Sequence, residues 1–357
     1  MKIIVTGAHF TVAQAVIEQL KKYPDMEIVY VGRNTTMEGD STKSVESIIL
    51  PKLGVKFIPI ITGRLQREFT AHTLLSLLKI PLGFLQAFWI ILRQKPDALL
   101  SFGGYVAVPL VFVSWLFSIP VIVHEQTLIA GLANRISGFF ATKIAVSFRV
   151  KYLYPEENTI VTGNPLRSEI LSAKNISKNK TPTILVTGGN QGSHVINLAV
   201  EECLDGLLKI CQVIHQTGDS KFKDYERLYL RESDRYKVEK FIDQGWGKIL
   251  AKVDLVVARA GINTLTELAY LAKPALLIPI PYLYKDEQNK NAEYFAKTGM
   301  VKNLPQSKLS GKELLKNIQE MFANLDVYKS GASKASALII RDGAKRVALE
   351  VVALVSV

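Results

Sequence analysis

Residues 183–200 read TILVTGGNQGSHVINLAV, and this stretch decides the fold class. A run of β-branched and apolar residues leads into a glycine-rich turn, which a helical pattern follows. This order of strand, glycine turn and helix opens a doubly wound α/β domain. Residues 2–16, KIIVTGAHFTVAQAV, repeat the order near the N-terminus. The two halves of the chain therefore begin in the same way.

Short β-branched runs alternate with longer helical patterns along the chain, as in parallel sheets with crossover helices. In the first half the predicted strands are Lys2–Val5, Glu27–Val31, Ala98–Ser101, Val121–His124 and Lys143–Val146. In the second half they are Thr183–Thr187, Gln212–His215, Leu255–Ala258 and Ala275–Pro279. The predicted fold class is α/β, with two doubly wound Rossmann-like domains facing each other across a cleft.

The length of 357 residues favours two domains over a single core. We predict an N-terminal domain over residues 1–165 and a second domain that begins at residue 166 and ends near residue 335. The polar stretch Ser172–Pro182, SAKNISKNKTP, is the best candidate for a linker.

The composition is that of a globular protein, with 48% hydrophobic and 21% charged residues. Two cysteines, Cys203 and Cys211, exclude a disulfide framework and a thiolate metal site. The five histidines lie far apart without an HExxH-type pair, so no metal site is predicted. The net charge of +12 calls for an anionic partner. Anionic lipid and phosphorylated substrates fit at least as well as nucleic acid, for which no binding signature is present, and we predict no nucleic-acid partner.

The longest apolar stretch is Leu74–Leu92, LLSLLKIPLGFLQAFWIIL. Its length would nearly span a bilayer, but Lys79, Pro81, Gly83 and Gln86 interrupt it. We expect a buried or surface-lying helix pair here. The N-terminal MKIIVTG has too short an apolar run for a signal peptide.

Three polar segments follow predicted strands in the second half. The turn Gly188–Ser193 precedes a helix, where main-chain amides and the helix dipole favour phosphate, although any α/β protein can carry such a turn. Glu267, within ARAGINTLTEL, could accept both hydroxyls of a ribose or could be an ordinary solvated glutamate. The segment Pro279–Asn291 offers amides and carboxylates suited to sugar hydroxyls, or it simply caps the next helix.

The first half has its own polar strand ends. Ser101–Pro109, SFGGYVAVP, combines two glycines with the hydroxyl of Tyr105. The run His124-Glu125-Gln126 ends a buried strand abruptly and continues toward Asn134, a pattern more often functional than not. Arg167 closes the run GNPLR at the junction of the halves, where it could meet a diphosphate.

Taken together, these motifs resemble the MurG family of bacterial glycosyltransferases, which have the GT-B fold. The matching strings run in family order: FGGYVAVP, HEQTLIAGLANR, TGNPLR, TGGNQGSHVIN, IHQTGD, ARAGINTLTELAYLAKPALLIPIP and DEQNKNA. The resemblance implies inverting transfer of N-acetylglucosamine from UDP-GlcNAc to the C4 hydroxyl of undecaprenyl-diphospho-N-acetylmuramoyl-pentapeptide (lipid I), giving lipid II for peptidoglycan. It implies no cofactor. It also implies a C-terminal helix, within residues 336–357, that packs back toward the N-terminal domain.

The resemblance carries site residues over position by position. On the donor side, in the second domain, the matching residues are Gly189, Asn190, Gln191, Gly192, Phe241, Ile242, Arg259, Glu267, Gln288 and Asn291. On the acceptor side they are Gly104, Tyr105, Gln126, Asn134 and Arg167. His9 and Glu125 are the candidates for the catalytic base that takes the proton of the acceptor hydroxyl, with His9 weakly favoured.

The chain also departs from the family pattern. Its first turn, Gly7-Ala8-His9, is shorter than the family's GGTGGH, and Val12 stands where the family has a proline. Thr127 replaces the usual Asn after HEQ, and Asn190 replaces a usual Ser. The first of these departures bears on acceptor binding.

The resemblance gives the apolar stretch a role in membrane binding. MurG-like enzymes carry an apolar patch with basic neighbours, and here Phe84, Phe88 and Trp89 are flanked by Arg64, Arg67, Arg93 and Lys95. We therefore expect a peripheral protein at the cytoplasmic face of the cell membrane, in contact with anionic inner-leaflet lipids. Such an enzyme would serve cell-wall biogenesis, cell shape and cell division.

Three alternatives remain open at this point. One is a GT-B transferase with another lipid acceptor, which the strings HEQ and GGYV argue against. A UDP-sugar 2-epimerase shares the two-domain design but has no need of an apolar, basic patch. The third is a non-catalytic UDP-sugar-binding protein, which would bind donor without turnover.

Overall fold

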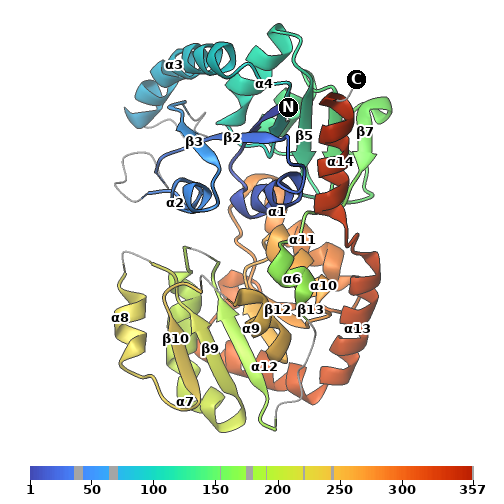
Figure 1. Ribbon diagram of the computed structural model, residues 1–357. Helices are drawn as coiled ribbons and strands as arrows, with labels where there is room; N and C mark the ends of the chain where they lie inside the picture. Colours follow the sequence, from blue (N-terminus) through green and yellow to red (C-terminus); the bar gives the residue numbers. More distant parts are fainter. Residues whose placement is uncertain are drawn as a thin grey trace. The chain divides into compact units, whose positions relative to one another are not determined.

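The computed structural model describes residues 1–35, 43–63, 71–152, 154–173, 180–189, 191–219, 222–242 and 245–355, with the side chains of residues 71–78 excepted. The chain divides into two compact units (Figure 1). Unit 1 comprises Met1–Arg167 together with Ile340–Val357, and unit 2 comprises Ser168–Ile339.

Unit 1 is built on a seven-stranded parallel sheet with the strand order β3-β2-β1-β4-β5-β6-β7. Its strands are β1 (Lys2–Thr6), β2 (Glu27–Gly32), β3 (Lys56–Pro59), β4 (Ala98–Ser101), β5 (Val121–Glu125), β6 (Lys143–Val146) and β7 (Thr159–Val161). Its helices are α1 (Phe10–Leu20), α2 (Val45–Lys52), α3 (Ala71–Gln94), α4 (Ala107–Leu116), α5 (Leu132–Gly138), η1 (Glu156–Asn158) and α14 (Gly343–Val355).

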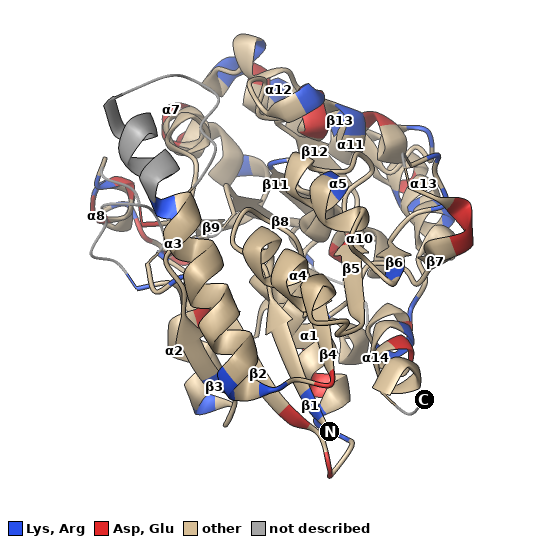
Figure 2. Ribbon diagram, turned by 90° about the horizontal axis from the view of Figure 1, so that it is seen from above, with Lys and Arg blue, Asp and Glu red and all other residues tan. Residues whose placement is uncertain are grey.

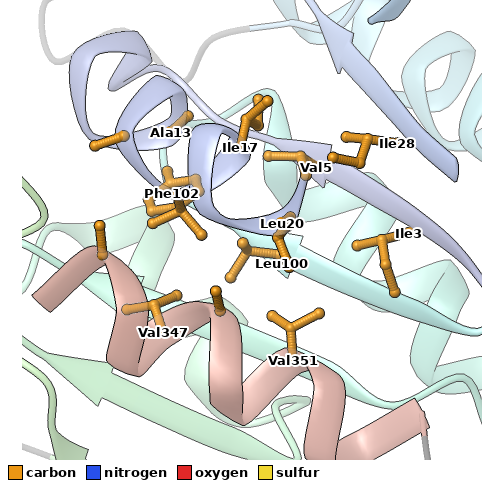
Figure 3. Packing of buried hydrophobic residues seen from close by; sticks show 14 of the residues in the cluster. Ile3, Val5, Ala13, Ile17, Leu20, Ile28, Leu100, Phe102, Val347 and Val351 are labelled. Atoms are coloured by element: carbon orange, nitrogen blue, oxygen red, sulfur yellow. The ribbon is translucent and has the colours of Figure 1, made fainter. Parts of the chain in front are cut away.

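The sheet of unit 1 is covered on both faces, as its runs of apolar residues require. Alternate side chains of β1 enter two separate cores, because successive residues of a strand point to opposite faces. Ile3 and Val5 pack with α1 and α14, whereas Ile4 packs toward α3 and α4. Figure 3 shows Val347 and Val351 of α14 facing the cluster formed by α1 and the strands. The C-terminal helix is therefore part of the first unit's core.

Unit 2 has a six-stranded parallel sheet with the order β10-β9-β8-β11-β12-β13. Its strands are β8 (Thr183–Thr187), β9 (Gln212–Gln216), β10 (Tyr236–Glu239), β11 (Leu255–Ala258), β12 (Ala275–Leu277) and β13 (Val301–Asn303). Its helices are α6 (Ser168–Ser172), α7 (His194–Ile210), α8 (Asp224–Tyr229), α9 (Trp246–Lys252), α10 (Ile262–Tyr270), η2 (Tyr284–Asp286), α11 (Glu287–Ala296), η3 (Gln306–Lys308), α12 (Gly311–Ala323) and α13 (Leu325–Leu338).

The predicted linker Ser172–Pro182 does not mark the passage between the units, which lies between Arg167 and Ser168. The short helix α6 already belongs to unit 2, because Ile170 is fully buried and Gly247 of α9 lies against the main chain of Glu169. Residues 174–179 of the predicted linker lie outside the described part of the chain.

The apolar stretch forms one helix of 24 residues, α3, and not the predicted helix pair. Pro81 lies inside this helix, where it removes one main-chain hydrogen bond. Packing against α4 holds the helix together: Phe84 meets Phe112 with ring centroids 5.6 Å apart, and Phe88 meets Phe117 at the same separation. Position 83 requires a glycine, because a Cβ there would come within 2.7 Å of the Thr62 side chain. Among the described residues, no helix is long and apolar enough to cross a membrane.

Candidate functional site

In each sheet the strand order reverses direction at the centre, and the loops that follow the two central strands open a crevice there. In unit 1 these are the loops after β1 and β4, and in unit 2 those after β8 and β11. Both glycine turns identified in the sequence lie at these positions. Each unit therefore presents one candidate site at the carboxyl edge of its own sheet.

The turn of unit 2 is shaped by glycines with left-handed backbones. Gly189 has φ +84° and Gly192 has φ +73°, and the Gly192 amide donates to the Gly189 carbonyl at 3.0 Å. A Cβ on Gly192 would overlap the carbonyl oxygen of Thr217, so no other residue fits without rearrangement. Helix α7 begins directly after this turn, and the first amides of a helix lack partners within it. Gln191 is exposed, and Asn190 lies outside the described residues.

Arg259, which directly follows β11, forms a hydrogen bond to this turn. Its Nη2 donates to Ser193 Oγ at 2.8 Å and its Nη1 to the Ile278 carbonyl at 2.9 Å. Burial lowers the pKa of the Arg259 guanidinium. A half-buried cation beside a glycine turn and a helix N-terminus is suited to an anionic group such as a diphosphate.

Glu267 lies on α10 and is only 5% exposed. Its Oε2 accepts a hydrogen bond of 2.8 Å from the indole Nε1 of Trp246, the first residue of α9. Sequence reasoning missed Trp246, which fixes the orientation of this carboxylate. Nearby in sequence, Ile242 is buried whereas Phe241 is 41% exposed. An exposed ring next to an anchored main chain is available to a planar base.

The side chains of Gln288 and Asn291, both on α11, use some of their polar atoms in hydrogen bonds to the main chain. Gln288 Oε1 accepts from the amides of Ala260 at 3.2 Å and Ile280 at 3.0 Å, so only its Nε2 remains for a sugar. Asn291 Nδ2 donates to the Ala260 carbonyl at 3.1 Å. Its Oδ1 is buried and has no hydrogen-bond partner among the described residues. A buried acceptor without a partner is what a ligand hydroxyl would satisfy.

The glycine turn of unit 1 is packed against the loop after β4. The Ala8 amide donates to the Gly103 carbonyl at 2.9 Å, and a Cβ on Gly104 would come within 2.6 Å of the Ala8 Cβ. His9 Nδ1 lies 2.9 Å from the Phe102 carbonyl oxygen, which can only accept. The ring therefore carries its proton on Nδ1 and presents a lone pair on Nε2. Burial lowers the pKa of His9, which keeps the ring neutral near pH 7.

Glu125, at the end of β5, is buried within a set of donors. Its Oε1 accepts from the Thr127 amide at 2.9 Å and hydroxyl at 2.6 Å. Its Oε2 accepts from Asn134 Nδ2 at 2.9 Å and from the Tyr154 hydroxyl at 3.4 Å. A buried carboxylate that accepts four hydrogen bonds is held in one orientation and fixes the positions of its donors. The neighbouring Gln126 is also buried, and its Oε1 has no partner among the described residues.

Tyr105 follows the glycines after β4 and contacts Arg33, which comes directly after β2. Arg33 Nη1 lies 3.4 Å from the Tyr105 hydroxyl, and its guanidinium stands 5.6 Å from the ring centroid. Because β1 lies between β2 and β4, this pair spans the turn after β1. Sequence reasoning did not identify Arg33. Arg167, the last residue of the first segment of unit 1, is half-buried.

Comparisons with known proteins agree with this division. Residues 3–146 match the N-terminal domain of glycosyltransferase family 28, and residues 183–347 match its C-terminal domain. The UDP-N-acetylglucosamine–N-acetylmuramyl-(pentapeptide) pyrophosphoryl-undecaprenol N-acetylglucosamine transferase of Clostridium botulinum is 34% identical over 348 residues, which is 94% of each chain. A similarly named Bacillus cereus protein is 33% identical over 93% of this chain and 95% of its own. The chain belongs to the MurG family.

Solved structures show the same fold. The crystal structure of Acinetobacter baumannii MurG matches with a TM-score of 0.72 at 24% identity, covering 98% of each chain. A UDP-GlcNAc 2-epimerase from Neisseria meningitidis matches with a TM-score of 0.67 at 14% identity, over 99% of this chain and all of that one. The predicted GT-B fold and MurG-family membership are thus confirmed. In this MurG-family chain, the described residues that were predicted to bind the donor lie in unit 2, and His9, Glu125 and the residues predicted to bind the acceptor lie in unit 1.

Proposed function

We propose that the chain transfers N-acetylglucosamine from UDP-GlcNAc to the C4 hydroxyl of the muramoyl sugar of lipid I, with inversion, and so makes lipid II. The observation that carries this proposal is 34% identity to a curated transferase of that name over 94% of both chains. The UDP-GlcNAc 2-epimerases with similar structures are 14% identical or less to this chain, which shows a shared fold alone. The product serves peptidoglycan synthesis and, through it, cell shape and division.

The donor's diphosphate is placed at the turn Gly188–Ser193. In the reaction the bond from the sugar's anomeric carbon to the diphosphate oxygen breaks, and UDP leaves with that electron pair. The amides at the start of α7 and the helix dipole stabilise the growing negative charge. The Arg259 guanidinium adds a fixed positive charge next to Ser193. Glu267 is assigned to the ribose, with its carboxylate oriented by the hydrogen bond from Trp246.

His9 is the better candidate for the general base. The acceptor hydroxyl gives its proton to His9 Nε2 while its oxygen bonds to the anomeric carbon. The hydrogen bond to the Phe102 carbonyl fixes the tautomer that this step needs, and burial keeps the imidazole neutral. Glu125, with both oxygens engaged, is a positioning residue that fixes Asn134 and Thr127. Tyr105, Gln126 and Asn134 are then placed around the acceptor.

The test is transfer of labelled N-acetylglucosamine from UDP-GlcNAc to a short-chain lipid I analogue. We expect transfer by the wild-type protein and its loss in Glu267→Ala. Glu293→Ala is the matched control, because Glu293 lies on neighbouring α11 outside the proposed donor set. Binding of UDP-GlcNAc without transfer would refute the proposed reaction and favour a binding protein. Interconversion of the donor sugar at C2 would favour an epimerase.

A membrane role is proposed for the apolar surface on α3 and α4. The apolar surface comprises the exposed side chains Leu82, Leu85, Trp89, Leu92, Trp115, Leu116 and Phe117. Figure 2 shows both helices almost free of charged residues, and Arg93 lies 5.9 Å from the Trp89 ring at the edge. Large exposed apolar side chains next to a cation are suited to the boundary of an anionic bilayer. Arg64 and Arg67 lie outside the described residues.

Sedimentation with vesicles tests this role. Wild-type protein should sediment with phosphatidylglycerol-containing vesicles, and Leu85→Ser/Trp89→Ser should remain in solution. Leu230→Ser is the matched control, because Leu230 is 86% exposed and belongs to unit 2, whereas α3 and α4 belong to unit 1. Equal sedimentation of both variants would refute a role for the apolar surface. Binding to neutral and anionic vesicles alike would remove the electrostatic part of the proposal.

A further inference from the structure

Gln216 is the last residue of β9 and is 2% exposed. The strand β9 lies between β10 and β8 in the sheet of unit 2. The turn Gly188–Ser193 follows β8, and the segment Lys240–Ile242 follows β10. A side chain at the end of β9 can therefore reach a loop on either side. None of the roles given above uses this residue.

The Gln216 amide bonds to both neighbours at once. Its Nε2 donates to Thr187 Oγ1 at 3.1 Å and to the Gly189 carbonyl at 3.2 Å. Its Oε1 accepts from the Ile242 amide at 3.0 Å. Both donor hydrogens and one acceptor site are thus used inside the protein. A buried amide with this arrangement holds its partners at a fixed spacing, because losing a bond leaves a buried polar group unpaired.

Thr187 extends this link to the backbone of the turn. Its Oγ1 also accepts from the Gly189 amide at 3.0 Å, so the hydroxyl joins Gln216 to the first left-handed glycine. The main chain beyond β9 is itself tied to the β10 side, since the Gly218 amide donates to the Lys240 carbonyl at 3.0 Å. The Gln216 side chain therefore links the turn directly to Ile242, alongside the main-chain path through Gly218.

We propose that Gln216 is a positioning residue that holds the diphosphate-binding turn at a fixed spacing from the uracil-side segment. The inference rests on the proposed function, which places a nucleoside diphosphate across these two loops. Nucleoside and diphosphate are then recognised as one unit, with the turn pre-organised for the diphosphate when the base is seated. Gln216 touches neither part of the ligand in this arrangement.

Variants that lose only the hydrogen bonds of Gln216 Nε2 can distinguish this positioning role from a general role in folding. Gln216→Glu keeps an acceptor for the Ile242 amide but cannot donate to Thr187 or Gly189. Thr187→Val removes the hydroxyl from the other end of the link and introduces no charge. Gln212→Glu is the matched control, because Gln212 is an exposed residue at the opposite end of the same strand. Affinities for UDP and for uridine are measured by calorimetry on the full chain.

We expect Gln216→Glu and Thr187→Val each to weaken UDP binding about tenfold and uridine binding less than about twofold. The double variant should lose little more than either single variant, because both changes break one link. The KM for UDP-GlcNAc should rise with the UDP dissociation constant. A smaller fraction of folded protein would lower kcat and leave KM unchanged, so this readout excludes mere misfolding.

Equal losses for UDP and uridine would overturn the positioning role, as would additive losses in the double variant. The role also fails if both variants bind UDP as tightly as Gln212→Glu does. Wild-type protein that binds neither UDP nor uridine would instead overturn the proposed function and the inference together. The two failures are therefore distinguishable from the same set of titrations.

Discussion

The two glycine turns occupy equivalent places in their units but differ in how they are held. Gly7–His9 is packed against the main chain of Phe102–Gly104, and the group proposed to act is the His9 side chain. Gly188–Ser193 also packs against main chain, at Thr217, but the Thr187 and Arg259 side chains bond to it as well, and the group proposed to act is the main chain at the start of α7. In the proposed reaction, the first turn supplies a base through a side chain, whereas the second stabilises charge through main-chain amides. The same local fold can serve either step of a transfer.

The largest effect should come from filling the space at Gly192. In Gly192→Ala the new Cβ meets the Thr217 carbonyl and the residue keeps a left-handed backbone. We expect a loss of about 3–5 kcal/mol in the free energy of unfolding of unit 2, with loss of UDP binding. Urea unfolding and calorimetry measure the two quantities.

Two further substitutions sharpen this result. Gly189→Ala has a similar φ but meets nothing within 4 Å, so it should cost only about 1–2 kcal/mol. Gly7→Ala would bring a Cβ within 2.7 Å of Phe102 in unit 1 and should leave UDP affinity unchanged. If Gly7→Ala weakened UDP binding as much as Gly192→Ala, the assignment of the two turns to different steps would be wrong.

His9→Ala should affect catalysis without affecting donor binding. We expect kcat to fall about 100- to 1,000-fold, the usual contribution of a general base, with UDP affinity unchanged. In the wild type, kcat should decline as the pH falls through the lowered pKa of His9, so the acid limb lies below pH 6.5. This limb should be absent in His9→Ala.

Glu125→Gln tests whether the acid limb of kcat belongs to His9 or to Glu125. The substitution keeps an acceptor but disturbs the donors Thr127 and Asn134, so activity should fall while the acid limb stays in place. An acid limb that disappears in Glu125→Gln and persists in His9→Ala would reverse the two roles.

A buried histidine stands near each turn, and both should make stability depend on pH. Burial lowers the pKa of His124 to about 4 and that of His215 to about 3. The unfolded chain, with a histidine pKa of about 6.5, binds more protons than the folded chain between these values. Stability present above pH 6.5 is therefore lost as the pH falls, by about 1.5 kcal/mol per histidine between pH 6.5 and 5.

Urea unfolding at pH 5, 6.5 and 8 measures this loss. His215→Gln should remove the pH-dependent loss of stability that arises in unit 2, where the His215 ring bonds to Asn197 and Tyr236. The pH-dependent loss that His124 causes in unit 1 should remain. A pH dependence unchanged by His215→Gln would show that other groups cause it.

Sequence reasoning predicted the interior of both sheets and missed their edges. Each predicted strand is present with ends within two residues, because buried strands carry continuous apolar runs. The strands it did not identify, β3, β7, β10 and β13, are those at the sheet edges. β3, β7 and β13 are short and partly exposed, and β10 alternates buried and exposed residues. Edge strands therefore lack the pattern that revealed the others.

The candidate site shows a similar division. Glycine turns and strand-end polar residues were visible because their pattern is local. The contacts that hold them are not local: Gln216 and Thr187 are 29 residues apart, and Arg33 and Tyr105 are 72 apart. Only the strand order brings such pairs together. The helix pair was predicted wrongly for a related reason. Pro81 removes one hydrogen bond from α3, but the non-local packing of α3 on α4 outweighs this loss.

The smallest effect expected here is that of Ser193→Ala, which tests how far side chains hold the second turn. The change removes the hydroxyl that accepts from Arg259 Nη2, while the bond from Nη1 to the Ile278 carbonyl remains. UDP affinity should therefore fall only about fivefold, close to 1 kcal/mol. Ser333→Ala, at an exposed position of α13, is the control. An unchanged affinity would mean that Ile278 alone positions Arg259, whereas a loss of 100-fold or more would make Ser193 itself a ligand of the diphosphate.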